Sequence, residues 1–211
     1  MMRVLVACEY SGTVRDAFLE LGHDALSCDL LPTDVPGPHY QGDVFDIINE
    51  GWDLLIGHPP CTYISKAGAR WLYPKAGEID KDRLKKGLEG KEFFMKLYNS
   101  SIKHIALENP TPLKAIGMPE PSQIIQPYEF GHPYSKRTLL WLKNLPPLEK
   151  TNIITNFTPY LPSNTGGKKR NQQYSRGTAK NWKESSTTFK GVAKAMAEQW
   201  SKPGIIQSQL F

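Results

Sequence analysis

Short runs of apolar residues alternate with amphipathic stretches along the first 145 residues of the chain. Runs rich in Val, Leu and Ile, each closed by a polar residue, glycine or proline, are typical of buried strands. They predict strands at Arg3–Ala7, Ala25–Cys28, Trp52–Gly57, His104–Leu107 and Thr138–Leu142.

Between these runs, apolar residues recur at helical spacing. The spacing predicts helices over Thr13–Leu21, Leu84–Ser101 and Thr187–Trp200. Gly22 closes the first helix as a C-cap residue. In the second helix the inward-facing residues are expected to be Leu88, Phe94, Leu97 and Tyr98. Alternating strands and helices predict an α/β fold, with a mostly parallel sheet and helices on both faces.

Two segments lack this periodicity. The stretch from Leu31 to Tyr40 holds three prolines and a glycine, which predicts a loop. Residues 150–186 are rich in Asn, Thr, Ser, Gly, Lys and Arg, which predicts a long loop or a small insertion. We therefore expect a single catalytic domain over residues 1–211.

Polar side chains follow several of the predicted strands. In a parallel sheet flanked by helices, ligands bind at the carboxyl ends of the strands. The residues expected at this edge are Glu9, Asp29, Cys61, Glu108 and Asn109.

Composition narrows the class of protein. Hydrophobic content of 39% and charged content of 22% are ordinary for a globular protein. No apolar run reaches the ~18 residues of a membrane span, and the short apolar start lacks a charged leader, so we expect neither a membrane anchor nor a signal peptide. The cysteines Cys8, Cys28 and Cys61 are odd in number and widely spaced, which predicts no disulfide framework, no zinc site and a reducing, cytoplasmic environment.

The segment from Asp53 to Cys61 carries the strongest chemical signal. A buried strand delivers the cysteine through two prolines, whose fixed backbone angles would hold the thiol in one place. Nearby positive charge, here from Lys66 and Arg70, would favour the nucleophilic thiolate. The alternative is that Cys61 is a small buried apolar residue.

This segment resembles the catalytic loop of the DNA (cytosine-5-)-methyltransferases, in which a strand precedes Gly-x-Pro-Cys. Four further segments resemble motifs of that family in the same order along the chain. They are Cys8–Gly12 before the first helix, Gly42–Val44, Ala106–Pro110 and Ser135–Thr138. The resemblance covers roughly residues 3–145 and the last helix, and is to a short form without a large target-recognition domain.

The resemblance implies a Rossmann-like methyltransferase fold and transfer of a methyl group from S-adenosylmethionine (SAM) to carbon 5 of cytosine in DNA. A Cys61 thiolate would add to carbon 6 and make carbon 5 nucleophilic. Glu108 would lie near the ring nitrogen N3, and Arg137 would stabilise the ring oxygen O2. Asn109 would fix the turn by hydrogen bonds from its side chain to the backbone.

The same resemblance implies a cofactor site. The turn after the first strand would offer backbone N–H groups to the ligand, with Gly12 allowing close approach, and an acid after the second strand would bind the ribose. An acid after Gly42 would meet the adenine. The residues so implied are Glu9, Tyr10, Ser11, Gly12, Asp29, Asp43 and Pro59. Asp29 alone reads equally as a cap on the end of a strand.

Positive charge is concentrated near Cys61 and in residues 168–190, where Tyr174 and Trp182 are interleaved with it. Basic and aromatic residues together are typical of nucleic-acid binding, although a solvated loop has the same composition. The candidate DNA-binding residues are Lys66, Arg70, Lys168, Lys169, Arg170 and Arg176.

Three functions remain open at this point. The first is a compact DNA methyltransferase, phage-encoded and active in the bacterial cytoplasm. The second keeps the chemistry but acts on a free cytosine nucleotide or uses a modified donor, because the turn at Glu9 has fewer glycines than the family's motif and Thr62 replaces its usual glutamine. The third is a non-catalytic module that binds SAM or nucleic acid. None of the three requires a metal.

Overall fold

A computed structural model of the chain describes residues 1–160 and 186–202. Within these residues seven strands form one sheet in the order β3-β2-β1-β4-β5-β8-β6. In that order the strands are His39–Gln41, Asp24–Asp29, Arg3–Ala7, Leu54–Gly57, His104–Pro110, Thr138–Lys143 and Gln123–Ile125.

The strands β1 to β5 pair with one another in parallel, whereas β8 is antiparallel to both of its neighbours, β5 and β6. The order of the five parallel strands is that of a Rossmann sheet. Because β8 runs in reverse, its first residue, Thr138, pairs with Pro110 at the carboxyl end of β5. We refer below to the edge formed by the carboxyl ends of β1, β2, β4 and β5 and the start of β8 as the rim.

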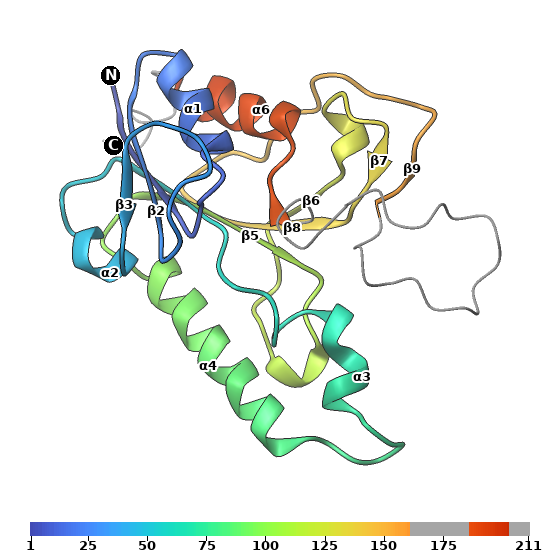
Figure 1. Cartoon of the computed structure of the whole chain (residues 1–211). Coiled ribbons are helices and arrows are strands. Elements are labelled where there is room, and N and C mark those ends of the chain that lie inside the picture. The colour runs from blue at the N-terminus through green and yellow to red at the C-terminus, as the bar shows by residue number, and fades with distance from the viewer. Residues whose placement is uncertain (161–185, 203–211) are drawn as a thin grey trace.

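Helices cover both faces of this sheet (Figure 1). On one face lie α1 (Thr13–Glu20) and α6 (Lys190–Trp200), and on the other lie α2 (Val44–Ile47) and α4 (Lys81–Tyr98). The α/β fold with a mostly parallel sheet and helices on both faces is therefore confirmed. The shorter elements are η1 (Lys66–Gly68), α3 (Ala69–Leu72), η2 (Lys114–Ile116), η3 (Pro127–Glu129), β7 (Tyr134–Ser135) and β9 (Thr158–Pro159).

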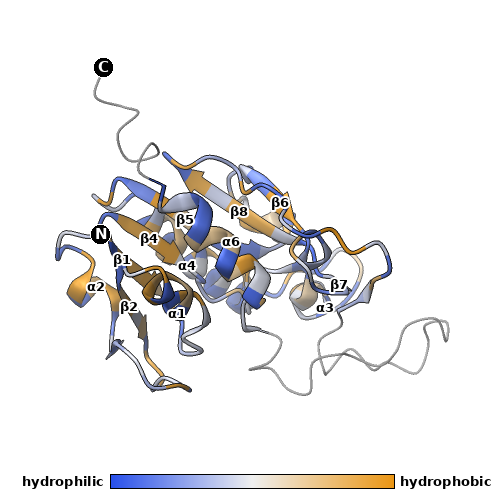
Figure 2. Ribbon diagram, turned by 90° about the horizontal axis from the view of Figure 1, so that it is seen from above, coloured by the Kyte–Doolittle hydropathy of each residue, from blue (hydrophilic) through white to orange (hydrophobic). Residues whose placement is uncertain are grey.

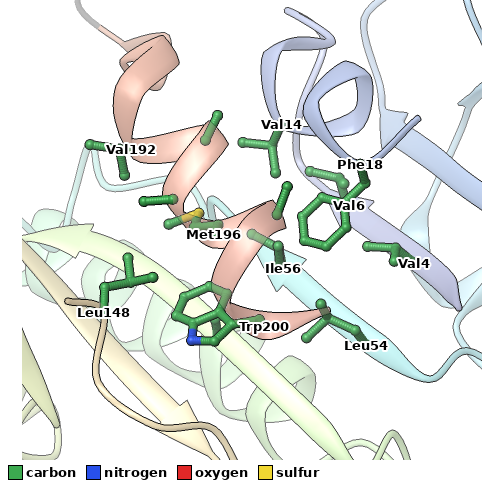
Figure 3. Packing of buried hydrophobic residues seen from close by; sticks show 14 of the residues in the cluster. Val4, Val6, Val14, Phe18, Leu54, Ile56, Leu148, Val192, Met196 and Trp200 are labelled. Carbon is green, nitrogen blue, oxygen red and sulfur yellow. The ribbon is translucent and has the colours of Figure 1, made fainter. Parts of the chain in front are cut away.

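The core under α1 and α6 is continuous, as Figure 3 shows. Val14 and Phe18 of α1 and Met196 and Trp200 of α6 are fully buried against the apolar residues of β1 and β4. The Trp200 indole donates a hydrogen bond to the Pro146 carbonyl at 3.0 Å, so its polar atom is satisfied in the core. The last helix is thereby fixed to β1 and β4, two of the strands whose carboxyl ends form the rim.

The opposite core shows why α4 has two different halves. Phe94 and Leu97, in its C-terminal half, are buried beneath the sheet. Leu88 is 41% exposed, so the prediction that it faces inward is wrong. The N-terminal half of α4 projects beyond the sheet beside α3 (Figure 1), where Leu84 packs on a separate small core around Leu72.

Other differences from the sequence predictions have local causes. Within the stretch predicted as a loop, Tyr40 belongs to the short strand β3, which pairs with β2. The strand β5 does not stop before Glu108 but continues to Pro110, because antiparallel pairing with β8 satisfies its backbone. The last helix begins at Lys190, three residues later than predicted.

The distribution of hydropathy agrees with this architecture. The central strands are the most apolar elements, and polar residues lie on the outer faces of the helices (Figure 2). No helix among the described residues combines the length and hydrophobicity needed to cross a membrane.

Candidate active site at the carboxyl ends of the strands

The chain turns from β4 to the rim through His58-Pro59-Pro60-Cys61. The His58 amide extends the pairing with β1 by donating to the Ala7 carbonyl at 3.0 Å. After the prolines, the carbonyl of Cys61 accepts hydrogen bonds from the amides of Ile64 and Ser65, which form a tight turn. Cys61 therefore stands at the top of this turn with its side chain partly exposed.

Asn109 fixes this turn from the neighbouring strand. Its side-chain amide donates a hydrogen bond to the Pro59 carbonyl at 2.9 Å, and the residue is only 2% exposed. This is the side chain to backbone hydrogen bond expected for Asn109. Pro59 serves as the acceptor in this contact, and no cofactor contact is needed to explain its position.

Glu108 and His58 form a pair within the rim. The His58 Nδ1 lies 3.1 Å from a carboxylate oxygen of Glu108, and the two side chains are 13% and 18% exposed. Because a carboxylate only accepts, the Nδ1 atom of His58 carries the proton. The other ring nitrogen, Nε2, is buried without a hydrogen-bond partner among the described residues.

His58 and Glu108 each favour the charged form of the other. Burial alone would lower the pKa of His58, but the hydrogen bond to Glu108 and the charges of Glu108 and Glu9 raise it above its ordinary value. Burial alone would raise the pKa of Glu108, but the hydrogen bond and charge of His58, together with the charge of Lys136, lower it. Both shifts favour an imidazolium bonded to a carboxylate.

Cys61 shares this electrostatic environment. Burial and the charge of Glu108 raise the pKa of the Cys61 thiol, whereas the charge of Lys136 lowers it. The charges of the Glu108 carboxylate and the Lys136 ammonium group therefore both act on the Cys61 sulfur. In the free protein the thiol is protonated at neutral pH, so the cationic side chain is what favours ionisation.

The cation that faces the site is Lys136, and its neighbour Arg137 is exposed. Lys136 lines a shallow hollow together with Glu108, Thr138, Thr188 and Phe189. Its ammonium nitrogen lies 5.7 Å from the Phe189 ring centre. Within the described residues, the structure brings Cys61, Glu108 and Asn109 together as the sequence indicated, and adds His58 and Lys136.

Sequence reasoning missed both added residues, although signals for them existed. His58 is the polar residue directly after β4, at the same level of the sheet as the other rim residues. Lys136 adjoins Arg137 in the quoted motif, and only the direction of the chain before β8 decides which of the two faces inward. Thr188 and Phe189 come from the start of α6, which no local pattern connects to β5.

On the cofactor side, the turn after β1 is filled by the protein itself. The Glu9 carboxylate, 4% exposed, accepts from the Val14 amide at 2.7 Å and the Arg15 amide at 3.2 Å. The Thr13 amide bonds the Ser11 hydroxyl at 3.4 Å. These groups cap the helix, and the expectation that Glu9 and the amides at the start of α1 meet a ligand stays a prediction.

Contacts within the protein also favour a glycine at position 12. Its φ is +71°, a conformation that favours glycine, and a Cβ there would lie 2.4 Å from the buried Arg15 guanidinium. The Arg15 guanidinium bonds the Pro36 carbonyl at 3.3 Å and so holds the loop before β3. Close packing on Arg15 is one reason for this glycine, and its contact with a cofactor stays a prediction.

The acidic residues of the predicted cofactor site do lie together. Asp29 and Asp43 both raise the pKa of Cys8, at the end of β1, after the larger effect of burial. Asp29 accepts from the Leu31 amide at 2.9 Å, and Asp43 caps α2 through the Phe45 amide at 3.0 Å. Each therefore has a structural role, yet both carboxylates flank the ends of β1 and β2, where a ribose would bind in this fold.

Tyr10 and Ser11 lie at the rim as well. The Tyr10 hydroxyl lies 2.8 Å from the Ser186 hydroxyl, which ties the first turn to the chain before α6. The Ser11 hydroxyl donates to Glu9 at 3.3 Å. Both side chains are engaged within the protein.

The candidate DNA-binding residues fall into two groups. Lys66 and Arg70 are exposed on η1 and α3, directly after the cysteine turn. Lys168, Lys169, Arg170 and Arg176 lie outside the described residues, as do Tyr174 and Trp182. Among the described residues, no group of three metal-ligating side chains gathers.

Comparison with known proteins shows a similarity at the level of structure. No family model matches the chain, and no curated protein matches its sequence. A solved structure of a triple mutant of DNMT2 from Spodoptera frugiperda aligns with a TM-score of 0.36 and 17% sequence identity. The alignment covers 77% of this chain and 56% of that one, so the chain spans about half the length of the solved protein.

Proposed function

We propose that this protein transfers a methyl group from SAM to carbon 5 of cytosine, with Cys61 as the nucleophile. The single observation that carries the proposal is the juxtaposition of Cys61, Glu108 and Lys136 at one rim, where the charges of Glu108 and Lys136 act on the Cys61 thiol and the charge of Lys136 acts on Glu108. A nucleophile, an acid and a cation are the groups that this reaction requires.

The steps assign one role to each group. The Cys61 thiol gives up its proton to solvent water, and the resulting thiolate forms a bond to carbon 6 of the ring, so that the electron pair of the C5–C6 double bond becomes available at carbon 5. SAM supplies the methyl group as an electrophilic sulfonium. Carbon 5 takes the methyl group, then loses its proton to a base, and the re-formed double bond expels the Cys61 thiolate.

The ring becomes electron-rich when sulfur adds, so N3 needs a proton. In the resting site that proton belongs to His58, which is bonded to Glu108. Transfer from His58 Nδ1 to Glu108, and from Glu108 to N3, leaves a neutral imidazole and conserves charge. Glu108 would touch the base, and His58 would act through Glu108 as a positioning residue and proton source.

The cation opposite the ring oxygen O2 would be Lys136 in place of Arg137. Lys136 is the residue that acts on both Cys61 and Glu108. Its charge would favour the thiolate before addition and the oxygen anion after it. Asp29 and Asp43 would hold the ribose and adenine of SAM at the ends of β1 and β2.

The test is incubation with methyl-tritiated SAM and either duplex DNA, single-stranded DNA or dCMP. We expect the tritiated methyl group to be bound covalently to the cytosine bases of the DNA. The substitution Cys61→Ser should abolish this labelling. Label in dCMP alone would select the free nucleotide as the substrate. Methyl transfer that survives Cys61→Ser would reject the mechanism. SAM binding without methyl transfer to any of the three substrates would favour a non-catalytic binding protein.

A covalent trap provides a second readout. DNA with 5-fluorocytosine cannot lose the group on carbon 5, so the enzyme should remain attached through Cys61. Mass spectrometry of the digested adduct should place the modification on the peptide that contains Cys61. An adduct on Cys8 or Cys28 would contradict the assignment of the nucleophile.

A further inference from the structure

A cluster of cations and aromatic rings lies beside the candidate active site on the side of α3 and α4. The Arg70 guanidinium stacks on the Trp71 ring at 3.9 Å, and the Arg83 guanidinium lies 5.4 Å from the same ring. Arg83 is also 4.9 Å from the Tyr63 ring, and the Lys86 ammonium is 5.4 Å from it. We call this row Arg70–Trp71–Arg83–Tyr63–Lys86 the cation–ring ladder.

The ladder is attached rigidly to the cysteine turn. Arg83 donates a hydrogen bond to the carbonyl of Thr62, the residue after Cys61, at 2.9 Å. Ile64 and Leu72 beneath the ladder are buried in the small core that also contains Ile116. A ligand that lies along the ladder would therefore be held in a fixed position relative to the Cys61 sulfur.

The ladder is accessible and carries unneutralised charge. Trp71 is 46% exposed, which is unusual for the largest apolar side chain. Within the described residues, no carboxylate forms an ion pair with Arg70, Arg83 or Lys86, although nearby Lys85 pairs with Glu89. Arg83 Nε is moreover buried with no hydrogen-bond partner in that part of the chain.

The charge of the whole segment favours a polyanion. Residues 62–91 contain eight Lys and Arg against four Asp and Glu, an excess of four, whereas the net charge of the complete chain is +5. Aromatic rings and guanidinium planes alternating with cations suit a strand whose bases stack and whose phosphates lie between them. An acidic peptide would use the charges and leave the exposed ring without a stacking partner.

We infer that the cation–ring ladder binds a single nucleic-acid strand next to the target cytosine, with a base on Trp71 and phosphates at Arg70 and Lys86. This inference rests on the proposed function for the position of the cytosine, but not for the binding itself. It favours DNA over a free nucleotide as the substrate, because dCMP has no neighbouring nucleotides to reach the ladder.

The binding test uses the full chain and a fluorescently labelled 12-nucleotide single strand with one central cytosine, followed by anisotropy over a range of salt concentrations. The variants are Trp71→Ala and Arg70→Gln, alone and combined. Each stacking or phosphate contact removed is expected to weaken binding about tenfold. Arg70→Gln should also reduce the slope of log affinity against log salt by about 0.7.

The matched control is Lys194→Gln, which removes one exposed cation from α6 on the other face of the sheet. It should leave both the affinity and the salt slope unchanged. Equal losses in Lys194→Gln and Arg70→Gln, or full affinity in Trp71→Ala, would overturn the inference. Displacement of the strand by polyglutamate at an equal concentration of charges would also overturn it in favour of an acidic protein.

The experiments distinguish failure of the proposed methyl transfer from failure of strand binding by the ladder. Because anisotropy needs neither SAM nor turnover, the ladder can be tested in Cys61→Ser, where binding should persist. If methyl transfer occurs, Trp71→Ala should reduce labelling of DNA and leave any labelling of dCMP unchanged. Loss of labelling of both substrates with normal strand binding would contradict the role of the ladder.

Discussion

Replacement of His58 by phenylalanine should destabilise the protein in a way that depends on pH. The hydrogen bond of 3.1 Å between His58 and Glu108 joins two mostly buried charged groups. A charge-assisted bond of this kind contributes about 1.5–3 kcal/mol, and its loss would lower the melting temperature of a chain of this size by roughly 3–12 °C. Phenylalanine keeps the ring and removes the donor.

The sign of the pH dependence follows from the two pKa shifts. The pKa of His58 is raised from 6.5, so its contribution to the free energy of unfolding is complete below 6.5 and is lost as pH rises through the raised value. The pKa of Glu108 is lowered from 4.5, so its contribution is complete above 4.5 and is lost as pH falls through the lowered value. The penalty of His58→Phe should therefore be largest between about pH 4.5 and 6.5.

Urea denaturation at pH 3, 5.5 and 9 measures this penalty directly. The control is His104→Phe, on the same strand as Glu108, where the lost partner is the neutral carbonyl of Asn144 at 2.8 Å. Both substitutions replace a mostly buried histidine by a ring of similar size, so the packing costs are comparable. If His58→Phe shows no maximum near pH 5.5, or follows the profile of His104→Phe, the ion pair is not as described.

Three other outcomes follow from the site. The rate of Cys61 alkylation by iodoacetamide, followed by peptide mass spectrometry, should rise with pH with a midpoint above pH 9. Lys136→Ala should move this midpoint higher, because a positive charge that favours the thiolate is lost. A midpoint near pH 7 would contradict this expectation. Gly12→Ala should lower the free energy of unfolding by about 1–3 kcal/mol, since a side chain is strained at a φ of +71° and has no room, and a neutral effect in chemical denaturation would contradict that packing. Asn109→Ala should lower the free energy of unfolding by about 1–3 kcal/mol, because it leaves the Pro59 carbonyl unpaired. It should reduce methyl transfer more than SAM binding. An equal loss of both would indicate a general disturbance of the fold.

The parts of the fold that the sequence predicted are those with strong periodicity. Buried parallel strands such as Arg3–Ala7 are continuous apolar runs, and their ends are visible from the polar residues that follow. The edge strands β3 and β6 have three residues each, too few for a pattern, and they exist because β2 and β8 offer free hydrogen-bonding groups. Such pairing over long sequence distances is absent from any local window.

The candidate site also contains residues that the sequence predicted and residues that it could not predict. Cys61, Glu108 and Asn109 could be found because each follows or ends a strand, and topology alone brings them to one rim. The use of Glu9 as a helix cap could not be found, because it depends on where the first amides of α1 point. The choice between Lys136 and Arg137 likewise depends on how the chain enters β8, which the composition of the motif does not reveal.

The reversal of β8 determines how this protein could acquire additional recognition elements. The segment between β5 and β8, which contributes the edge strand β6, leaves β5 at Pro110 and enters β8 at Thr138, two residues that are paired side by side. New chain inserted there would begin and end beside the reactive groups without changing the register of any strand. Had β8 been parallel, its six residues would place the returning end ~20 Å away, at the far edge of the sheet. Growth at this connection is therefore a low-cost route to new binding surface beside the candidate active site, with the sheet left intact.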